Sequence, residues 1–195
     1  MASSRRGCTR RPTGRPPWCG WAARAAGSMG RPGACTRAWR ARLAARGIAS
    51  LRLHYRRPNQ LEDCVMDTLI GAEYLALKCG YQSIALVGHS FGGAVVIAAG
   101  ALSNTVTAVV AMSSQTYGTD LVPRISPRPL LLLHGSADEV LSDACSRYIY
   151  AHAKEPKELR LYPGCGHGLD ECREQVDTEV VGWLVKQLTA PKAVH

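Results

Sequence analysis

The segment Gly88–Gly93, with the sequence GHSFGG, constrains the fold of this 195-residue chain more than any other. It joins a short apolar run over 83–87 to a run rich in small residues over 92–102, which predicts a strand, a sharp turn and a helix. In a G-x-S-x-G turn the serine, here Ser90, lies at the apex in a strained backbone conformation, and its hydroxyl is exposed. The segment therefore predicts an α/β protein that presents a serine as a nucleophile.

Predicted strands and helices alternate along most of the chain. The strands expected from the apolar pattern are 48–54, 83–87, 106–112, 129–134 and 158–162, and the helices are 36–45, 61–79, 91–102, 142–153 and 171–188. This alternation predicts a parallel sheet with helices on both faces. About 150 residues of this pattern can bury one adequate core, so a single domain is expected over 39–190.

Two other predicted strands are followed by residues that can activate a serine. Asp138 lies in the loop after strand 129–134, and His167 lies in a glycine-flanked loop after strand 158–162. A serine nucleophile needs a general base, and the base needs a carboxylate that orients it. Because the carboxyl ends of parallel strands meet at one edge of a sheet, Ser90, Asp138 and His167 are expected to converge there.

Three neighbouring residues are alternatives for these roles. Glu139 follows Asp138 directly and is a substitute acid. His89 precedes the serine and is expected to pack under the turn. His134 ends a predicted strand and is expected to be structural rather than catalytic.

Taken together, the segments GHSFGG, LLLHGSAD and YPGCGHGLDE resemble the α/β-hydrolase superfamily. They are most similar to its small dienelactone-hydrolase-like and acyl-peptidase-like branch, and the resemblance covers about 43–188. It implies that Ser90 is the nucleophile, Asp138 the acid and His167 the general base. True dienelactone hydrolases use cysteine at the nucleophile position, so the resemblance carries over the fold and not the substrate.

The expected oxyanion hole has one evident donor. The backbone N–H of Phe91, the residue after the serine, is expected to face a developing oxyanion. In the superfamily an upstream His-Gly-type loop supplies a second donor. No His-Gly precedes Ser90, and Gly27 to Gly33 follow no evident apolar strand. The sequence therefore predicts an α/β-hydrolase fold that is N-terminally truncated or degenerate.

Two functions follow from this combination and stay open. The first is a serine hydrolase of weak activity, which acts on small ester or related acyl substrates through an acyl-serine intermediate. The second is a non-catalytic α/β-hydrolase-like binding protein with an incomplete oxyanion hole.

The formal net charge of +9 is concentrated near the N-terminus. All 14 basic residues before Glu62 are arginines and no acidic residue precedes it, whereas 10 basic and 15 acidic residues follow from Glu62 onward. Residues 1–38 show no apolar period that could be buried, and are expected to lie outside the domain. A transit segment, a disordered arm and an altered start are the alternatives. Because the hydrolase-like body is acidic, no nucleic-acid partner is expected.

The eight cysteines show no metal-binding or disulfide pattern. No C-x-x-C occurs, and the pair Cys165 and Cys172 has no second pair at zinc-like spacing, so no metal or cofactor is expected. Reduced thiols and the lack of a secretory signal predict an intracellular protein, cytoplasmic or organellar. The apolar stretch 85–102 is interrupted by GHSFGG, which favours a strand and a helix over a membrane span. The oligomeric state is left open.

Overall fold

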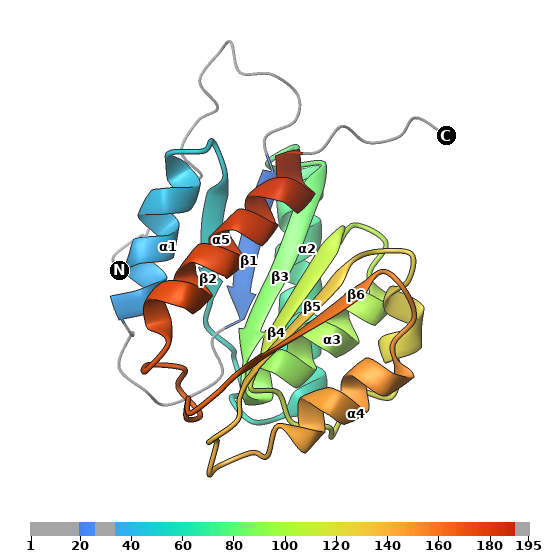
Figure 1. Ribbon diagram of the computed structural model, residues 1–195. Coiled ribbons are helices and arrows are strands. Elements are labelled where there is room, and N and C mark those ends of the chain that lie inside the picture. The colour runs from blue at the N-terminus through green and yellow to red at the C-terminus, as the bar shows by residue number, and fades with distance from the viewer. Residues whose placement is uncertain (1–19, 26–33, 190–195) are drawn as a thin grey trace, which may run out of the picture.

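The computed structural model describes residues 20–25 and 34–189, with side chains from Trp39 onward (Figure 1). Its elements are β1 (Gly20–Ala25), α1 (Ala34–Ala44), β2 (Ala49–Leu53), α2 (Leu61–Leu77), β3 (Ser83–His89), α3 (Phe91–Leu102), β4 (Ala108–Met112), the 3₁₀ helix η1 (Val122–Ile125), β5 (Leu130–Gly135), α4 (Ala144–His152), β6 (Lys157–Tyr162) and α5 (Arg173–Thr189).

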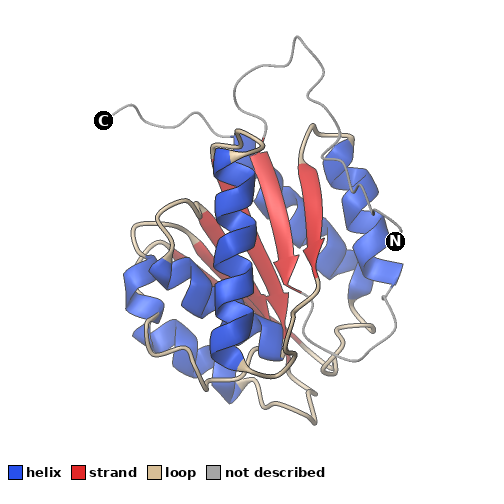
Figure 2. Ribbon diagram, turned by 180° about the vertical axis from the view of Figure 1, so that it is seen from behind, coloured by secondary structure: helices blue, strands red, loops and turns tan. Residues whose placement is uncertain are grey.

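The strands form one parallel sheet in the order β2-β1-β3-β4-β5-β6. Helices α2, α3 and α4 cover one face, and α1 and α5 cover the other (Figures 1 and 2). This arrangement confirms the expected fold class. Within the described part of the chain, no helix is long and apolar enough to cross a bilayer.

The central strands β3, β4 and β5 are buried on both faces of the sheet. Ile84 and Leu86 point into the core beneath α2 and α3, whereas Ala85 and Val87 point into the core beneath α1 and α5. Strands of this kind have almost continuous apolar sequences because neither face meets water. The same burial fixes the strand ends, which carry the polar residues of the candidate site.

Strand β1 corrects part of the expectation that residues 1–38 lie outside the domain, whereas 1–19 and 26–33 lie outside the described residues. Ala25 pairs with Leu53 of β2 on one side and with Gly88 of β3 on the other. The sequence GWAARA has no long apolar run, but an interior parallel strand forms backbone hydrogen bonds with both neighbours and needs few large side chains to do so. Helix α1 also begins before the expected boundary, at Ala34.

Candidate active site

Ser90 occupies a sharp turn between β3 and α3. Its backbone has φ 57° and ψ −125°, a conformation that non-glycine residues rarely adopt. A Cβ atom on Gly88 would lie 2.0 Å from the carbonyl oxygen of Gly92, so the turn can close only if residue 88 is glycine. The Ser90 N–H also donates to the Met112 carbonyl of β4 at 2.8 Å. These constraints hold the Ser90 hydroxyl at the carboxyl edge of the sheet.

Asp138 lies in the loop after β5, and its side chain is fully buried. Its Oδ1 atom accepts the backbone N–H groups of Val140 at 2.9 Å and Leu141 at 2.8 Å. Burial alone would raise the pKa of Asp138. Hydrogen bonds from the Leu141 N–H, the His167 ring and the Val140 N–H outweigh burial and hold this pKa below its ordinary value. The side chain is therefore a carboxylate that can only accept hydrogen bonds.

His167 lies in the loop after β6 and joins the serine to the carboxylate. Its Nδ1 atom is 2.8 Å from Asp138 Oδ2, and its Nε2 atom is 2.9 Å from Ser90 Oγ. Its side chain is 21% exposed, so solvent reaches the His167 ring but not the Asp138 carboxylate. The structure thus brings the three expected side chains together within hydrogen-bonding distance.

The loop that carries His167 packs closely on the end of β5. The Ala137 N–H donates to the Cys165 carbonyl at 3.0 Å, and the Gly164 N–H donates to Ser136 Oγ at 3.1 Å. A Cβ atom on Gly135 would lie 2.1 Å from the same Cys165 carbonyl oxygen. Glycine at position 135 therefore allows the Asp138 loop and the His167 loop to approach each other.

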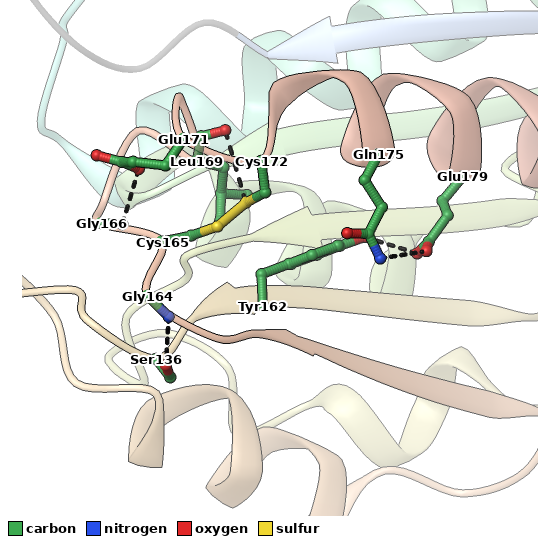
Figure 3. Close-up of a disulfide and its surroundings, with 10 residues drawn as sticks. All are labelled: Ser136, Tyr162, Gly164, Cys165, Gly166, Leu169, Glu171, Cys172, Gln175 and Glu179. Atoms are coloured by element: carbon green, nitrogen blue, oxygen red, sulfur yellow. Dashed lines mark hydrogen bonds between the residues drawn. A yellow bond between two sulfur atoms is a disulfide. The ribbon is translucent and has the colours of Figure 1, made fainter.

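A disulfide between Cys165 and Cys172 closes this loop, which corrects the expectation that the cysteines are reduced (Figure 3). Cys172 directly precedes α5, so the bridge ties the His167 loop to the start of that helix. Glu171 lies within the closed segment and accepts the Gly166 N–H at 3.0 Å (Figure 3). The cysteine spacing did not reveal the bridge, because a disulfide across one short loop needs no second pair of cysteines. This pair therefore gives no support to the expected intracellular location, which was based on reduced thiols.

The sequence pointed to two sources of oxyanion donors, the Phe91 N–H and an upstream loop. Phe91 is the first residue of α3, where backbone N–H groups have no partner within the helix. Strand β1 ends at Ala25, beside Gly88, so a strand does precede Gly27 to Gly33, contrary to the expectation from sequence. That glycine-containing segment itself lies outside the described residues.

Two histidines near the site have contacts that the sequence did not reveal. The ring Nε2 of His89 is 2.7 Å from the carbonyl oxygen of His167, and the two rings lie 4.8 Å apart between centroids. His89 therefore contacts the His167 loop. His134 Nε2 is 3.0 Å from Asp138 Oδ2. Glu139, the alternative acid, is exposed. Only the adjacency of His89 to Ser90 and of His134 to the Asp138 loop could have suggested these contacts.

Among the described residues, no group of three or more His, Cys, Asp or Glu side chains is arranged to hold a metal ion. The polar side chains at this edge of the sheet instead bond to one another. The arrangement can abstract a proton from a hydroxyl and stabilise the charge that forms on the base.

Comparisons with known proteins give mainly distant likenesses, and no protein-family model matches the chain. The uncharacterized protein YfhR of Escherichia coli O157:H7 is 32% identical over 109 residues, which cover 44% of this chain and 38% of that protein. The chain thus matches well under half the length of this curated relative.

Solved structures match over nearly the whole chain. Est1E from Butyrivibrio proteoclasticus is 19% identical with a TM-score of 0.77, and the match covers 90% of this chain and 91% of that one. Est1E has also been solved with ferulic acid bound. Dienelactone hydrolase from Anabaena variabilis is 21% identical with a TM-score of 0.76, and the match covers 91% and 89% of the two chains. With its parallel sheet and its serine at the strand-to-helix turn, the chain has the α/β-hydrolase fold.

Proposed function

We propose that this chain is a serine hydrolase that cleaves small carboxylic esters through an acyl-serine intermediate. The observation that carries the proposal is the hydrogen-bonded series from Ser90 through His167 to Asp138. Because the carboxylate can only accept, His167 Nδ1 carries a proton and donates to it. His167 Nε2 is then unprotonated and accepts the Ser90 hydroxyl, as a general base must.

The chemistry follows from these proton positions. As Ser90 Oγ bonds to the ester carbonyl carbon, its proton passes to His167 Nε2, and the Asp138 carboxylate stabilises the imidazolium. The Phe91 N–H is the proposed donor to the negative oxygen. When the tetrahedral intermediate collapses, the alkoxide leaves and takes the proton from Nε2. Water then attacks the acyl-serine in the same way, which releases the carboxylic acid.

The neighbours support an ester as the substrate class. A dienelactone hydrolase is named for a lactone, which is a cyclic ester, and ferulic acid bound to Est1E is a carboxylic acid of the kind that ester cleavage releases. The alternative of a non-catalytic binding protein arose from the missing upstream His-Gly-type loop, which leaves the oxyanion hole with one evident donor. Strand β1 precedes the position of such a loop, and the hydrogen-bonded series from Ser90 to Asp138 favours the hydrolase over this alternative.

Hydrolysis of p-nitrophenyl acetate and butyrate tests the proposal. The wild-type chain is expected to turn both over, and Ser90→Ala and His167→Ala are each expected to abolish nearly all of that turnover. The two losses should be similar, because members of such a triad act as a unit and their effects do not add. A folded wild-type chain that is no faster than Ser90→Ala on either ester would favour the binding protein instead.

A further inference from the structure

His134 is the last ring on β5 before the Asp138 loop, and its side chain is fully buried. Its Nε2 atom lies 3.0 Å from Asp138 Oδ2 and 2.8 Å from the carbonyl oxygen of Leu141. Its Nδ1 atom lies 2.7 Å from Oγ of Ser146, a fully buried serine on α4. Every polar atom of this buried ring therefore has a partner, as burial requires.

The chemistry of the partners fixes the direction of each hydrogen bond. A backbone carbonyl and a carboxylate can only accept, so the Nε2 atom of His134 must carry the proton and donate to both. In the neutral ring the Nδ1 atom is then unprotonated and accepts the hydroxyl proton of Ser146. The Leu141 carbonyl and the Asp138 carboxylate therefore select this ring form, and Ser146 satisfies its Nδ1 atom.

Two histidines consequently donate to the same carboxylate oxygen. Asp138 Oδ2 accepts from His134 Nε2 on one side and from His167 Nδ1 on the other. The other oxygen, Oδ1, accepts two backbone N–H groups of the same loop. The carboxylate has no rotation that keeps all of these donors, so its orientation toward His167 is determined.

We propose that His134 is a positioning residue for the candidate triad, and that Ser146 holds its ring in place through Nδ1. The pair holds Asp138 Oδ2 where it can orient the His167 ring toward Ser90. The pair also links α4 to the active edge of the sheet, because Ser146 belongs to that helix. This inference rests on the proposed hydrolase function, but its physical core concerns the His167–Asp138 hydrogen bond and can be measured separately.

Two substitutions at residue 134 separate the hydrogen bond to Asp138 from the hydrogen bond to Ser146. In His134→Gln the amide nitrogen can take the place of Nε2 and still donate to Asp138. In His134→Asn the shorter amide can take the place of Nδ1 and reach Ser146, but not Asp138. If the ring has only a structural role, the kcat of the Gln variant should be no higher than that of the Asn variant. If the ring positions Asp138, the Gln variant should recover part of the lost kcat.

The first readout is ester hydrolysis resolved into kcat and KM. His134→Asn is expected to lower kcat roughly 10–100-fold with KM nearly unchanged, because a small misplacement of a catalytic group costs this much. His134→Gln is expected to retain most of the wild-type kcat. Equal kcat values for Asn, Gln and wild type, with cooperative unfolding in all three, would overturn the proposal.

The second readout is the NMR resonance of the proton between His167 Nδ1 and Asp138 Oδ2. It should be sharp in the wild type and in His134→Gln, and broadened or absent in His134→Asn. This signal does not depend on turnover. If the wild type cleaves no ester, the hydrolase proposal fails, and the NMR comparison still decides whether His134 orders the bond; an unchanged resonance in His134→Asn overturns the inference.

Ser146→Ala keeps the test usable if the residue 134 variants do not fold. It removes only the hydroxyl that bonds to His134 Nδ1 and holds the ring in place, and is expected to lower kcat and broaden the same resonance. Ser113→Ala is the matched control, because Ser113 is also fully buried and its Oγ has no hydrogen-bond partner among the described residues. Equal effects of the two alanine variants would overturn the role assigned to Ser146.

Discussion

At the scale of single residues, the candidate site is organised around one carboxylate. Asp138 accepts four hydrogen bonds, two on each oxygen, and its side chain has no exposed surface. Hydrogen bonds to a charged group are about twice as strong as those between neutral groups, which offsets the cost of burying the charge. The position of His167 depends on this carboxylate rather than on packing alone.

The lowered pKa of Asp138 predicts how its contribution to stability changes with pH. A carboxyl whose pKa is lower in the folded state stabilises the fold at pH values above its unfolded pKa of about 3.9, and this stabilisation is lost as pH falls through the folded pKa. The free energy of unfolding of Asp138→Asn should therefore lie well below that of wild type at about pH 5, and the difference should shrink toward about pH 2. Urea unfolding over this range measures it.

The exposed Asp120 supplies the control, because Asp120→Asn should match the wild type throughout. A difference between wild type and Asp138→Asn that stays constant or grows on acidification would contradict the assigned direction of the shift.

At the scale of elements, the loops after β5 and β6 meet at Gly135. A Cβ atom there would collide with backbone atoms of Cys165 and Gly166, which cannot move without shifting the loop. Gly135→Ala is therefore expected to lower the free energy of unfolding by about 1–3 kcal/mol and to displace His167. The measurements are urea unfolding and ester turnover.

Gly182→Ala is the matched control, since nothing lies within 4 Å of an added Cβ on that residue of α5. Alanine there should be neutral or stabilise the helix by up to about 1 kcal/mol. Similar destabilisation at positions 135 and 182 would show that the close approach at Gly135 is not what matters.

The disulfide gives a second prediction at this scale. Closing a loop as short as the one between Cys165 and Cys172 restricts the unfolded chain and stabilises the fold by roughly 2–3 kcal/mol in the chain-entropy account. Reduction with a dithiol should lower stability by about this amount and slow ester turnover, because the loop carries His167. The double variant Cys165→Ala/Cys172→Ala should not respond to the dithiol. Identical behaviour of reduced and oxidised wild type would contradict the prediction.

At the scale of the whole molecule, β1 lies inside the sheet and not at its edge. It pairs with β2 on one side and β3 on the other, so its removal would leave both neighbours unpaired in the middle of the sheet. A chain that lacks residues 1–33 is therefore expected to lose cooperative unfolding, whereas one that lacks only 1–19 retains β1 and should keep it. Circular dichroism during thermal unfolding compares them. Cooperative unfolding of the shorter chain would contradict the interior position of β1.

The sequence predicted the sheet best where strands are buried on both faces. Strand β3 was expected at 83–87, and the structure places it over Ser83–His89. The pattern at β4 was expected to start at residue 106. The ladder begins only at Ala108, because the side chain and backbone of Thr107 bond to Ile84 before regular pairing starts.

The convergence of Ser90, Asp138 and His167 could also be predicted, because each follows the carboxyl end of a parallel strand. Strand β1 could not be predicted, because it lacks the apolar run that marks the other strands and is held in the sheet by backbone pairing with two neighbours. The contact of His134 with Asp138 depends on the fold of a single loop, and local sequence does not encode it. The bridge between Cys165 and Cys172 depends on how the His167 loop folds back toward the start of α5.

Covalent labelling with a fluorophosphonate tests whether Ser90 is an activated nucleophile, because the probe reports an activated serine without knowledge of the substrate. The intact wild-type chain is expected to gain one phosphonyl group, located on the peptide that contains Ser90. Ser90→Ala and His167→Ala should remain unlabelled. Labelling at another serine, or no labelling of a folded wild-type chain, would show that Ser90 is not the activated nucleophile.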